Sequence, residues 1–199
     1  MEVVLLPKGN NGDFHGIGLR DPSWKVLEKI LDGRLANLEC HDCLRGFLAN
    51  RGCGTAILET KLVQQPAFLA LVLMYGGSID LKKDFGAIYR GGCVRILRDH
   101  CVGEKALRLI TTFWKEAVLV CQAGSNYGRA FKGLCGTTQG IPLSPWMFGI
   151  MVDAVVREWL WQIIPDDIAI KGVGDKIRMM LVYFYVGDSL VACRDPNLL

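Results

Sequence analysis

Residues 136–148 read GTTQGIPLSPWMF, and this stretch decides more of the fold than any other. The glycines and hydroxyl residues at its start predict a loop, and Pro145 begins a long helix that continues to about residue 163. A glycine-bearing loop that leads into a helix presents free backbone N–H groups, which a nucleotide or a template can approach closely. The same residues also suit an ordinary loop with a helix cap, so this stretch by itself leaves both interpretations open.

Two flanking stretches each place one carboxylate beside an apolar run. Residues 78–85 read SIDLKKDF, with Asp80 at the end of a strand, and residues 184–189 read FYVGDS, with Asp188 at the tip of a hairpin. If the two strands are neighbours in one sheet, the two carboxylates meet. Mg²⁺ on a phosphate substrate is commonly held by one or two carboxylates. An aspartate at a strand end can equally be a turn residue.

The composition bounds the class of protein. The chain has 199 residues, a size typical of one domain, and a formal net charge of +3. This charge excludes a histone-like tail and an acidic disordered protein, and it permits nucleic-acid binding without requiring it. Apolar residues make up 51% of the chain, so we expect either a sheet buried on both faces or an exposed apolar surface that self-associates.

The sequence predicts an intracellular protein. No apolar run approaches the ~20 residues of a membrane-spanning helix, so we expect no membrane partner. Glu2 and Pro7 do not fit a secretory signal, and we expect a cytoplasmic or nuclear protein, not a secreted one, whose eight cysteines are free thiols. Cys40-His41-Asp42-Cys43, near Cys53, has the spacing of half a zinc site, but no second ligand pair follows and free cysteines are favoured.

The order of elements favours the α+β class. We expect helices over residues 22–35, 56–69, 92–98, 104–116 and 145–163, and strands over residues 3–6, 71–80, 117–122, 129–135, 177–186 and 190–193. Pro7 should stop the first strand, residues 10–13 should form a turn, and Asp21-Pro22 should cap and begin the first helix. Thr55 should cap the second helix, and Pro66 should kink it. Because helices and strands do not alternate strictly, we predict an antiparallel sheet covered by helices on one side, with residues 71–80 as a buried strand.

Taken in this order, the three stretches resemble motifs A, B and C of a reverse transcriptase, an RNA-directed DNA polymerase, of the non-LTR retrotransposon and group II intron type. Motif A is residues 80–86, motif B is residues 136–148 with its QG-x-PLSP core, and motif C is residues 185–188. Residues near the N-terminus resemble two strands of the fingers. The resemblance implies a right-hand polymerase fold, with partial fingers at residues 1–70 and a palm at residues 71–199 whose small antiparallel sheet is backed by helices.

The resemblance also implies nucleotidyl transfer by a two-metal mechanism on an RNA template with a DNA primer and a dNTP. Asp80 and Asp188 would be catalytic and would bind Mg²⁺ or Mn²⁺, and the backbone carbonyl of Leu81 would complete one metal's shell. The residues expected to contact the nucleotide or the template are Lys8 at the triphosphate, Phe85 as a steric gate beneath the sugar, Gln139 and Gly140 in the pocket wall, and Tyr185 beneath the primer end.

Several positions depart from the family's pattern. The family's motif C reads Tyr-x-Asp-Asp, and Gly187 replaces its first aspartate, so metal binding is expected to be weak or absent. We expect Asp188 to be turned partly away from the site, because neighbours on an extended strand point to opposite faces. Gly86 replaces the aspartate that usually ends motif A, and His15 replaces an arginine of the second fingers strand. Asp99-His100-Cys101 stands where a glycine turn is common.

The chain ends eleven residues after Asp188, and we expect the thumb, which grips the duplex in this family, to be absent. Losing ~4 kcal/mol of transition-state stabilisation slows a reaction roughly a thousandfold. The sequence therefore predicts a truncated, catalytically impaired reverse transcriptase of a retroelement. The alternative is an inactive remnant that acts at most as a nucleic-acid-binding or partner-binding module.

Overall fold

The computed structural model describes residues 1–8, 13–81, 84–163 and 180–193. The chain divides into two compact units, of which the first is Met1–Glu39 with Lys83–Met151 and the second is Cys40–Lys82 with Val152–Leu199. Each unit has its own sheet and its own helices, which confirms the mixed α+β class. The division into fingers and palm at residue 70 stays a prediction.

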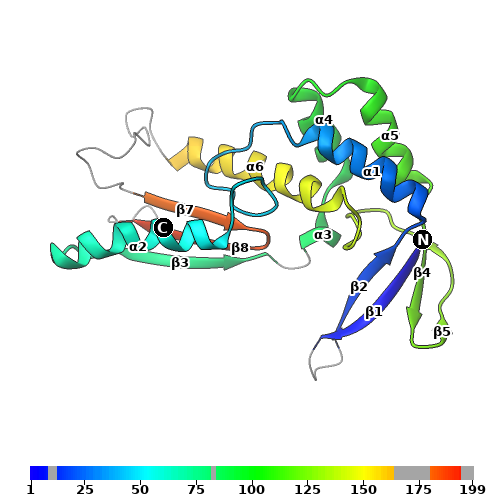
Figure 1. Ribbon diagram of the computed structural model, residues 1–199, viewed down its shortest axis with the longest axis horizontal. Coiled ribbons are helices and arrows are strands. Elements are labelled where there is room, and N and C mark those ends of the chain that lie inside the picture. Colours follow the sequence, from blue (N-terminus) through cyan, green and yellow to red (C-terminus); the bar gives the residue numbers. More distant parts are fainter. Residues whose placement is uncertain (9–12, 82–83, 164–179, 194–199) are drawn as a thin grey trace. The chain divides into compact units, whose positions relative to one another are not determined.

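The sheet of the first unit contains both parallel and antiparallel pairs (Figure 1). Its main strands follow the order β2-β1-β4-β5, and β6 also pairs with β4; their bounds are β1 Glu2–Lys8, β2 Asp13–Leu19, β4 Val118–Ala123, β5 Asn126–Tyr127 and β6 Phe131–Lys132. The pair β1–β4 is parallel, so the prediction of a purely antiparallel sheet is wrong for this unit. About a hundred residues separate the two strands, which is ample for the crossover that parallel strands require.

Strand β1 continues past Pro7, where the sequence predicted its end. Its pairing with β4 covers only Glu2–Val4, while its pairing with β2 continues to Lys8. Pro7 therefore lies where one edge of β1 has no partner among the described strands, and proline is tolerated at such an edge because its missing N–H interrupts no ladder bond. The expected turn over residues 10–13 lies mostly outside the described residues.

The helices of the first unit pack into an apolar core. They are α1 (Pro22–Leu35), α3 (Asp84–Ala87), α4 (Arg90–Asp99), α5 (Glu104–Lys115) and the first part of α6 (Ser144–Ile163). Asp21 caps α1 as predicted, because its side chain accepts a hydrogen bond from the Ser23 N–H at 2.9 Å. The ring of Trp24 in α1 meets Phe113 in α5 edge-on, with 5.2 Å between ring centres. Helices α4 and α5 add the fully buried side chains of Leu97, Leu107 and Ile110.

Helix α4 ends in a turn that would ordinarily contain glycine. The N–H of Val102 donates to the carbonyl of Leu97, and Cys101 adopts the left-handed conformation with φ of 58°. This conformation is favoured by glycine and strains other residues. The turn therefore has the shape that a glycine would stabilise, although a cysteine occupies it.

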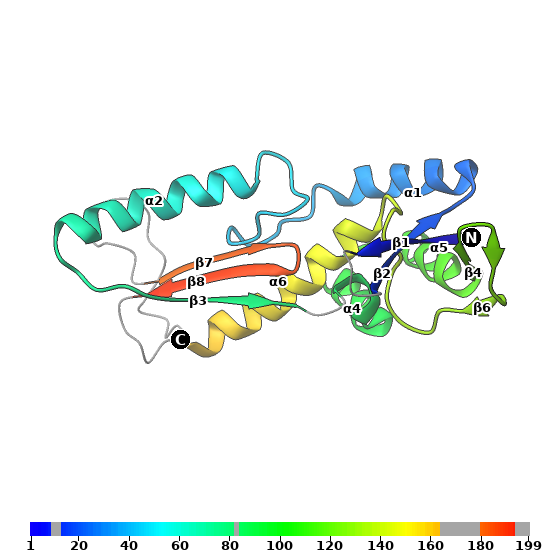
Figure 2. The same cartoon turned by 90° about the horizontal axis from the view of Figure 1, so that it is seen from below.

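The second unit holds a three-stranded antiparallel sheet with one long helix along it. The strand order is β3-β8-β7, with β3 Tyr75–Asp80, β7 Met180–Tyr185 and β8 Asp188–Cys193. Helix α2 (Cys53–Leu69) runs beside this sheet in both views (Figures 1 and 2), and its Ala56 packs against Tyr183 and Ala192. The part of α6 from Val152 onward also belongs to this unit.

Helix α2 begins earlier than the sequence predicted and continues through Pro66. Gly52 occupies the N-cap position, and its N–H donates to the Thr55 hydroxyl at 3.2 Å, so Thr55 lies inside the first turn instead of preceding the helix. Pro66 falls in the last turn, so the helical hydrogen bond that its missing N–H removes affects only the end of the helix. No helix in the described ranges is both long enough and apolar enough to cross a membrane.

Strand β3 was predicted to be buried, and this prediction is wrong: all six of its residues are exposed. In the described part of the chain β3 pairs only with β8, so it forms an edge of its sheet. The apolar sequence of residues 71–80 indicated a strand, which begins only at Tyr75, and it could not indicate whether other elements cover that strand.

Candidate functional site: a carboxylate pair and the motif B loop

The second unit brings three of the predicted site residues into one row. Asp80 of β3 lies directly opposite Asp188 of β8, and Asp188 lies directly opposite Tyr185 of β7. Residues that face each other in an antiparallel ladder project from the same face of the sheet, with Cβ atoms ~4.5–5.5 Å apart. The prediction that motif A and motif C bring two carboxylates together on one sheet is therefore confirmed.

The expectation that Asp188 turns away from Asp80 is wrong. It assumed that Gly187 and Asp188 are neighbours on an extended strand, whereas residues 186 and 187 form the two-residue turn between β7 and β8. Val186 takes a φ of 57° in this turn, and Asp188 is the first residue of β8. The carbonyl of Gly187 accepts the N–H of Leu81 at 2.9 Å, so position 187 lies beside the end of β3.

The two carboxylates have the chemistry of a divalent-cation site. Both side chains are exposed, and none of the described residues donates a hydrogen bond or forms an ion pair with either of them. Like charges directly opposite each other in a ladder repel, and a cation between them removes this repulsion. Within the described ranges no group of three or more histidine, cysteine, aspartate or glutamate side chains could hold a metal ion. The pair thus fits one hydrated Mg²⁺, whose other ligands would be water or substrate oxygens.

The motif B loop, residues 136–142, lies in the first unit and is held by backbone hydrogen bonds on two sides. Gly136 and Thr137 donate their N–H groups to the carbonyls of Ile88 and Phe85, at 2.8 and 2.7 Å. On the other side, the N–H of Gly18 in β2 donates to the carbonyl of Gln139 at 2.7 Å. The loop is therefore joined both to the second strand and to the end of motif A with the residues that follow it.

Glycine is required at the start of this loop. Gly136 has φ of 71°, and a Cβ atom there would lie 2.5 Å from the carbonyl oxygen of Gly86. A side chain at position 86 itself would instead point into open space. Packing among the described residues therefore gives no reason for glycine, in place of the family's aspartate, at position 86.

Phe85, the predicted steric gate, is a buried residue in this structure. Its ring centre lies 5.2 Å from that of Phe148 on α6, and only 9% of the residue is exposed. Packing therefore fixes the position of the ring, which a steric gate needs, although little of the ring surface is accessible to a substrate. Its role at the sugar stays a prediction.

The remaining predicted residues of the first unit lie on strands β1 and β2 and in the motif B loop. Gly140 has φ of 89° and follows Gln139 in the motif B loop. His15 is exposed on β2, opposite Leu6. Lys8 is the last residue of β1, and its side chain lies outside the described part of the structure.

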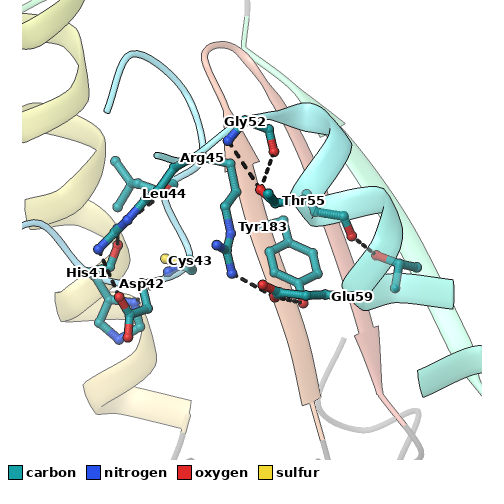
Figure 3. Close-up of polar contacts among 12 residues, drawn as sticks. His41, Asp42, Cys43, Leu44, Arg45, Gly52, Thr55, Glu59 and Tyr183 are labelled. Carbon is teal, nitrogen blue, oxygen red and sulfur yellow. Dashed lines mark hydrogen bonds and ion pairs between the residues drawn. The ribbon is translucent and has the colours of Figure 1, made fainter. Parts of the chain in front are cut away.

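Sequence reasoning missed a loop that borders motif C. The backbone of residues 43–45 pairs with the outer edge of β7. The N–H of Arg45 donates to the carbonyl of Phe184 at 2.7 Å, and the N–H of Phe184 donates to the carbonyl of Cys43 at 2.9 Å. Arg45 also forms an ion pair with Glu59 of α2 at 2.7 Å, and the Tyr183 hydroxyl donates to the same Glu59 oxygen (Figure 3). These contacts join residues up to 124 positions apart, so no local pattern could predict them.

The cysteines of this loop are neutral thiols in the fold. Burial raises the pKa of Cys43 to about 12 and also raises that of Cys40. The Nδ1 of His41 accepts the N–H of Cys43 at 3.2 Å. None of the eight cysteines forms a disulfide.

Comparison with known proteins gives one sequence relative and several structural ones. No protein-family model matches the chain. The chain is 23% identical over 170 residues to the retrovirus-related Pol polyprotein from the type-1 retrotransposable element R2 of Popillia japonica, a match that covers 78% of the chain and 23% of that polyprotein.

The solved structures of similar fold include telomerases. Apo telomerase from Candida tropicalis, truncated from its C-terminal domain, matches with a TM-score of 0.64 at 13% identity, covering 99% of this chain and 44% of that one. Telomerase from Candida albicans in complex with a TWJ fragment of telomeric RNA matches with a TM-score of 0.63 at 11% identity, covering 99% and 38%. The chain thus spans about a quarter of its sequence relative and less than half of these structures. The chain therefore resembles part of a retrotransposon Pol polyprotein in sequence and part of telomerase in fold.

Proposed function

We propose that this chain is part of an RNA-directed DNA polymerase of a retroelement, and that it carries the polymerase's metal-binding carboxylates. The observation that carries the proposal is the row formed by Asp80, Asp188 and Tyr185 across three adjacent strands. Asp80 and Asp188 belong to separate sequence motifs, 108 positions apart in the chain. Such a coincidence is hard to explain if the two aspartates are ordinary turn residues.

In this proposal Asp80 and Asp188 hold Mg²⁺ or Mn²⁺, and the carbonyl of Leu81 adds a ligand. Bound metal would activate the primer hydroxyl and neutralise charge on the triphosphate. The chain's own contribution is to fix the two carboxylates through the β3–β8 ladder, while Tyr185 supports the primer end beside them. Lys8 would contact the triphosphate of the dNTP, and Phe85 would exclude a 2′-hydroxyl.

The motif B loop would line the pocket for the nucleotide and the RNA template through Gln139 and Gly140. Its attachment to β2 and to Phe85 supports this role, because a template surface must keep its shape when a ligand arrives. Telomerase of similar fold has been solved with a fragment of telomeric RNA, which supports a nucleic-acid partner in general terms. The proposed site of action is the cytoplasm or the nucleus.

We further propose that the site is impaired. Gly187 offers no carboxylate beside Asp80, and Gly86 and His15 lack the charged groups of the family's pattern. The alternative function, an inactive remnant that binds nucleic acid or a protein partner, rests on the same three positions. Metal binding by the native chain should accordingly be weak.

Calorimetric titration of Mn²⁺ into a small set of variants tests this proposal. Gly187→Asp places a third carboxylate beside the end of β3 and should tighten binding by about tenfold or more, because each ~1.4 kcal/mol of added attraction is a factor of ten. Adding Asp80→Asn to that variant should abolish the gain. Asp99→Asn, which removes an exposed carboxylate at the end of α4, is the matched control and should change nothing.

An unchanged affinity in the Gly187→Asp variant, with its circular dichroism intact, would refute the assignment of position 187 to the metal site. Primer extension on an RNA template then separates the two functions. Extension by the Gly187→Asp variant that disappears with Asp80→Asn supports the polymerase. Template binding with no extension in any variant supports the binding module.

A further inference from the structure

We propose that Arg90 is a positioning residue for the motif B loop, and that it sets the shape of the surface offered to nucleotide and template. The proposal concerns the first unit alone, and its functional part rests on the function proposed above. Arg90 is the first residue of α4, and none of the three motifs includes it.

The guanidinium of Arg90 connects two points of the backbone, one just before the loop and one at its first residue. Its Nε donates to the carbonyl of Gly136 at 2.8 Å, and its Nη1 donates to the carbonyl of Gly133 at 2.6 Å. The planar, forked geometry of arginine suits two acceptors at fixed spacing, whereas lysine offers a single point charge. The two bonds therefore fix the distance between residues 133 and 136.

The environment of Arg90 makes these two bonds costly to lose. The side chain is half-buried, and burial lowers the pKa of Arg90, although arginine remains charged at neutral pH. No carboxylate among the described residues pairs with this charge. Its compensation comes from the two carbonyls and from the ring of Trp114, whose centre lies 5.7 Å from the guanidinium carbon. The charge therefore loses part of its stabilisation when the loop moves away from Arg90.

Side-chain packing alone does not fix the position of the loop, because a small cavity adjoins its residues Thr137 and Thr138. Arg90 and Trp114 also line this cavity. A cavity leaves room for the loop to shift inward, and Arg90 opposes that shift by holding Gly136 at its carbonyl. Thr137, the next residue, donates its N–H to the carbonyl of Phe85, and Gln139 lies three residues after Gly136 in the same loop.

Amide hydrogen exchange tests the hold of Arg90 on the loop without any need for activity. Arg90→Leu should speed exchange at the Gly136 and Thr137 amides at least tenfold, and Arg90→Lys should speed it by less. Arg95→Leu is the matched control, because Arg95 is an exposed residue of the same helix and bonds to none of the described residues. It removes the same charge and should leave both amides unchanged. Unchanged exchange at these amides in folded Arg90→Leu and Arg90→Lys proteins would overturn the proposal.

Binding of a fluorescent dNTP in the presence of an RNA–DNA primer-template tests the functional part. Arg90→Leu should weaken nucleotide binding about tenfold and Arg90→Lys about threefold, while Arg95→Leu should bind as the native chain does. Faster exchange with unaltered nucleotide binding would overturn the positioning role. If the native chain binds neither nucleotide nor primer-template, the proposed function fails instead, and the exchange rates alone then decide whether Arg90 holds the loop.

Discussion

Replacing Gly18 by alanine should displace the motif B loop, and the structure gives the size of the effect. A Cβ atom at position 18 would lie 2.5 Å from the Cγ2 methyl of Thr138 and 3.3 Å from the carbonyl oxygen of Gln139. Carbon atoms in contact prefer ~3.5–4.0 Å, so the loop must retreat by about 1 Å. That movement lengthens the 2.7 Å hydrogen bond from the Gly18 N–H to Gln139.

Two costs and one gain make up the change in the free energy of unfolding. Overpacking costs ~1–3 kcal/mol, and the weakened hydrogen bond costs ~1 kcal/mol. Alanine returns ~0.5–1 kcal/mol, because it restricts the unfolded chain more than glycine does. We therefore expect Gly18→Ala to lower the free energy of unfolding by about 2 kcal/mol, measured by urea denaturation.

The matched control is Gly33→Ala in α1. No atom lies within 4 Å of a Cβ placed there, and the position is exposed, so this variant should gain ~0.5–1 kcal/mol. The amide of Gly18 should also exchange faster in Gly18→Ala and not in Gly33→Ala. A Gly18→Ala protein as stable as the native chain, with unchanged exchange at residue 18, would refute the close contact between β2 and the loop.

Three further predictions concern other parts of the chain. Cys101→Gly should stabilise the protein by up to ~1 kcal/mol in thermal or urea unfolding, because it relieves the left-handed cysteine at the end of α4; a loss of stability would contradict the strain. Burial raises the pKa of Glu28 despite its ion pair with Arg20, so its stabilising contribution is full below the ordinary carboxyl pKa of about 4.3 and declines as the pH rises through the raised value. Unfolding measured from pH 4 to 8 should therefore show the native chain losing stability relative to Glu28→Gln as pH increases, and parallel curves would refute this. Light scattering should detect self-association driven by exposed apolar side chains of α2, and Leu62→Lys, at a residue 61% exposed, should reduce it; a monomeric native chain at tens of micromolar would argue against such a surface.

The sequence predicted best those features that depend on residues close together in the chain. Asp21-Pro22 predicted the start of α1, and the glycines of residues 136–142 predicted a loop, because capping and turn preferences act over a few residues. The meeting of Asp80 and Asp188 is a long-range feature, and only the order of the three motifs predicted it.

The features that the sequence did not predict depend on distant partners. Arg45 and Tyr183 meet at Glu59, and Arg90 binds carbonyls more than forty positions away, and nothing in the neighbouring residues of either arginine indicates these partners. The turn at residues 186–187 shows a second limit. The alternation of side chains along an extended strand was applied to Gly187 and Asp188, which placed Asp188 on the wrong face. Residue 187 lies in the turn and Asp188 begins β8, and the facing of side chains in a hairpin depends on where the turn begins and ends.

The exposed edge of strand β3 is a place where a second copy of the chain can pair. Its backbone edge can accept another strand, and residues 75–79 carry no charge that would discourage one. Gly76 and Gly77 lower the β-propensity of this segment, and Asp80 places a negative charge at its end, as gatekeeper residues do beside aggregation-prone sequences. The same carboxylate that is proposed to bind a metal would then also repel a second copy of the strand, so removing its charge would weaken both metal binding and the protection against strand pairing.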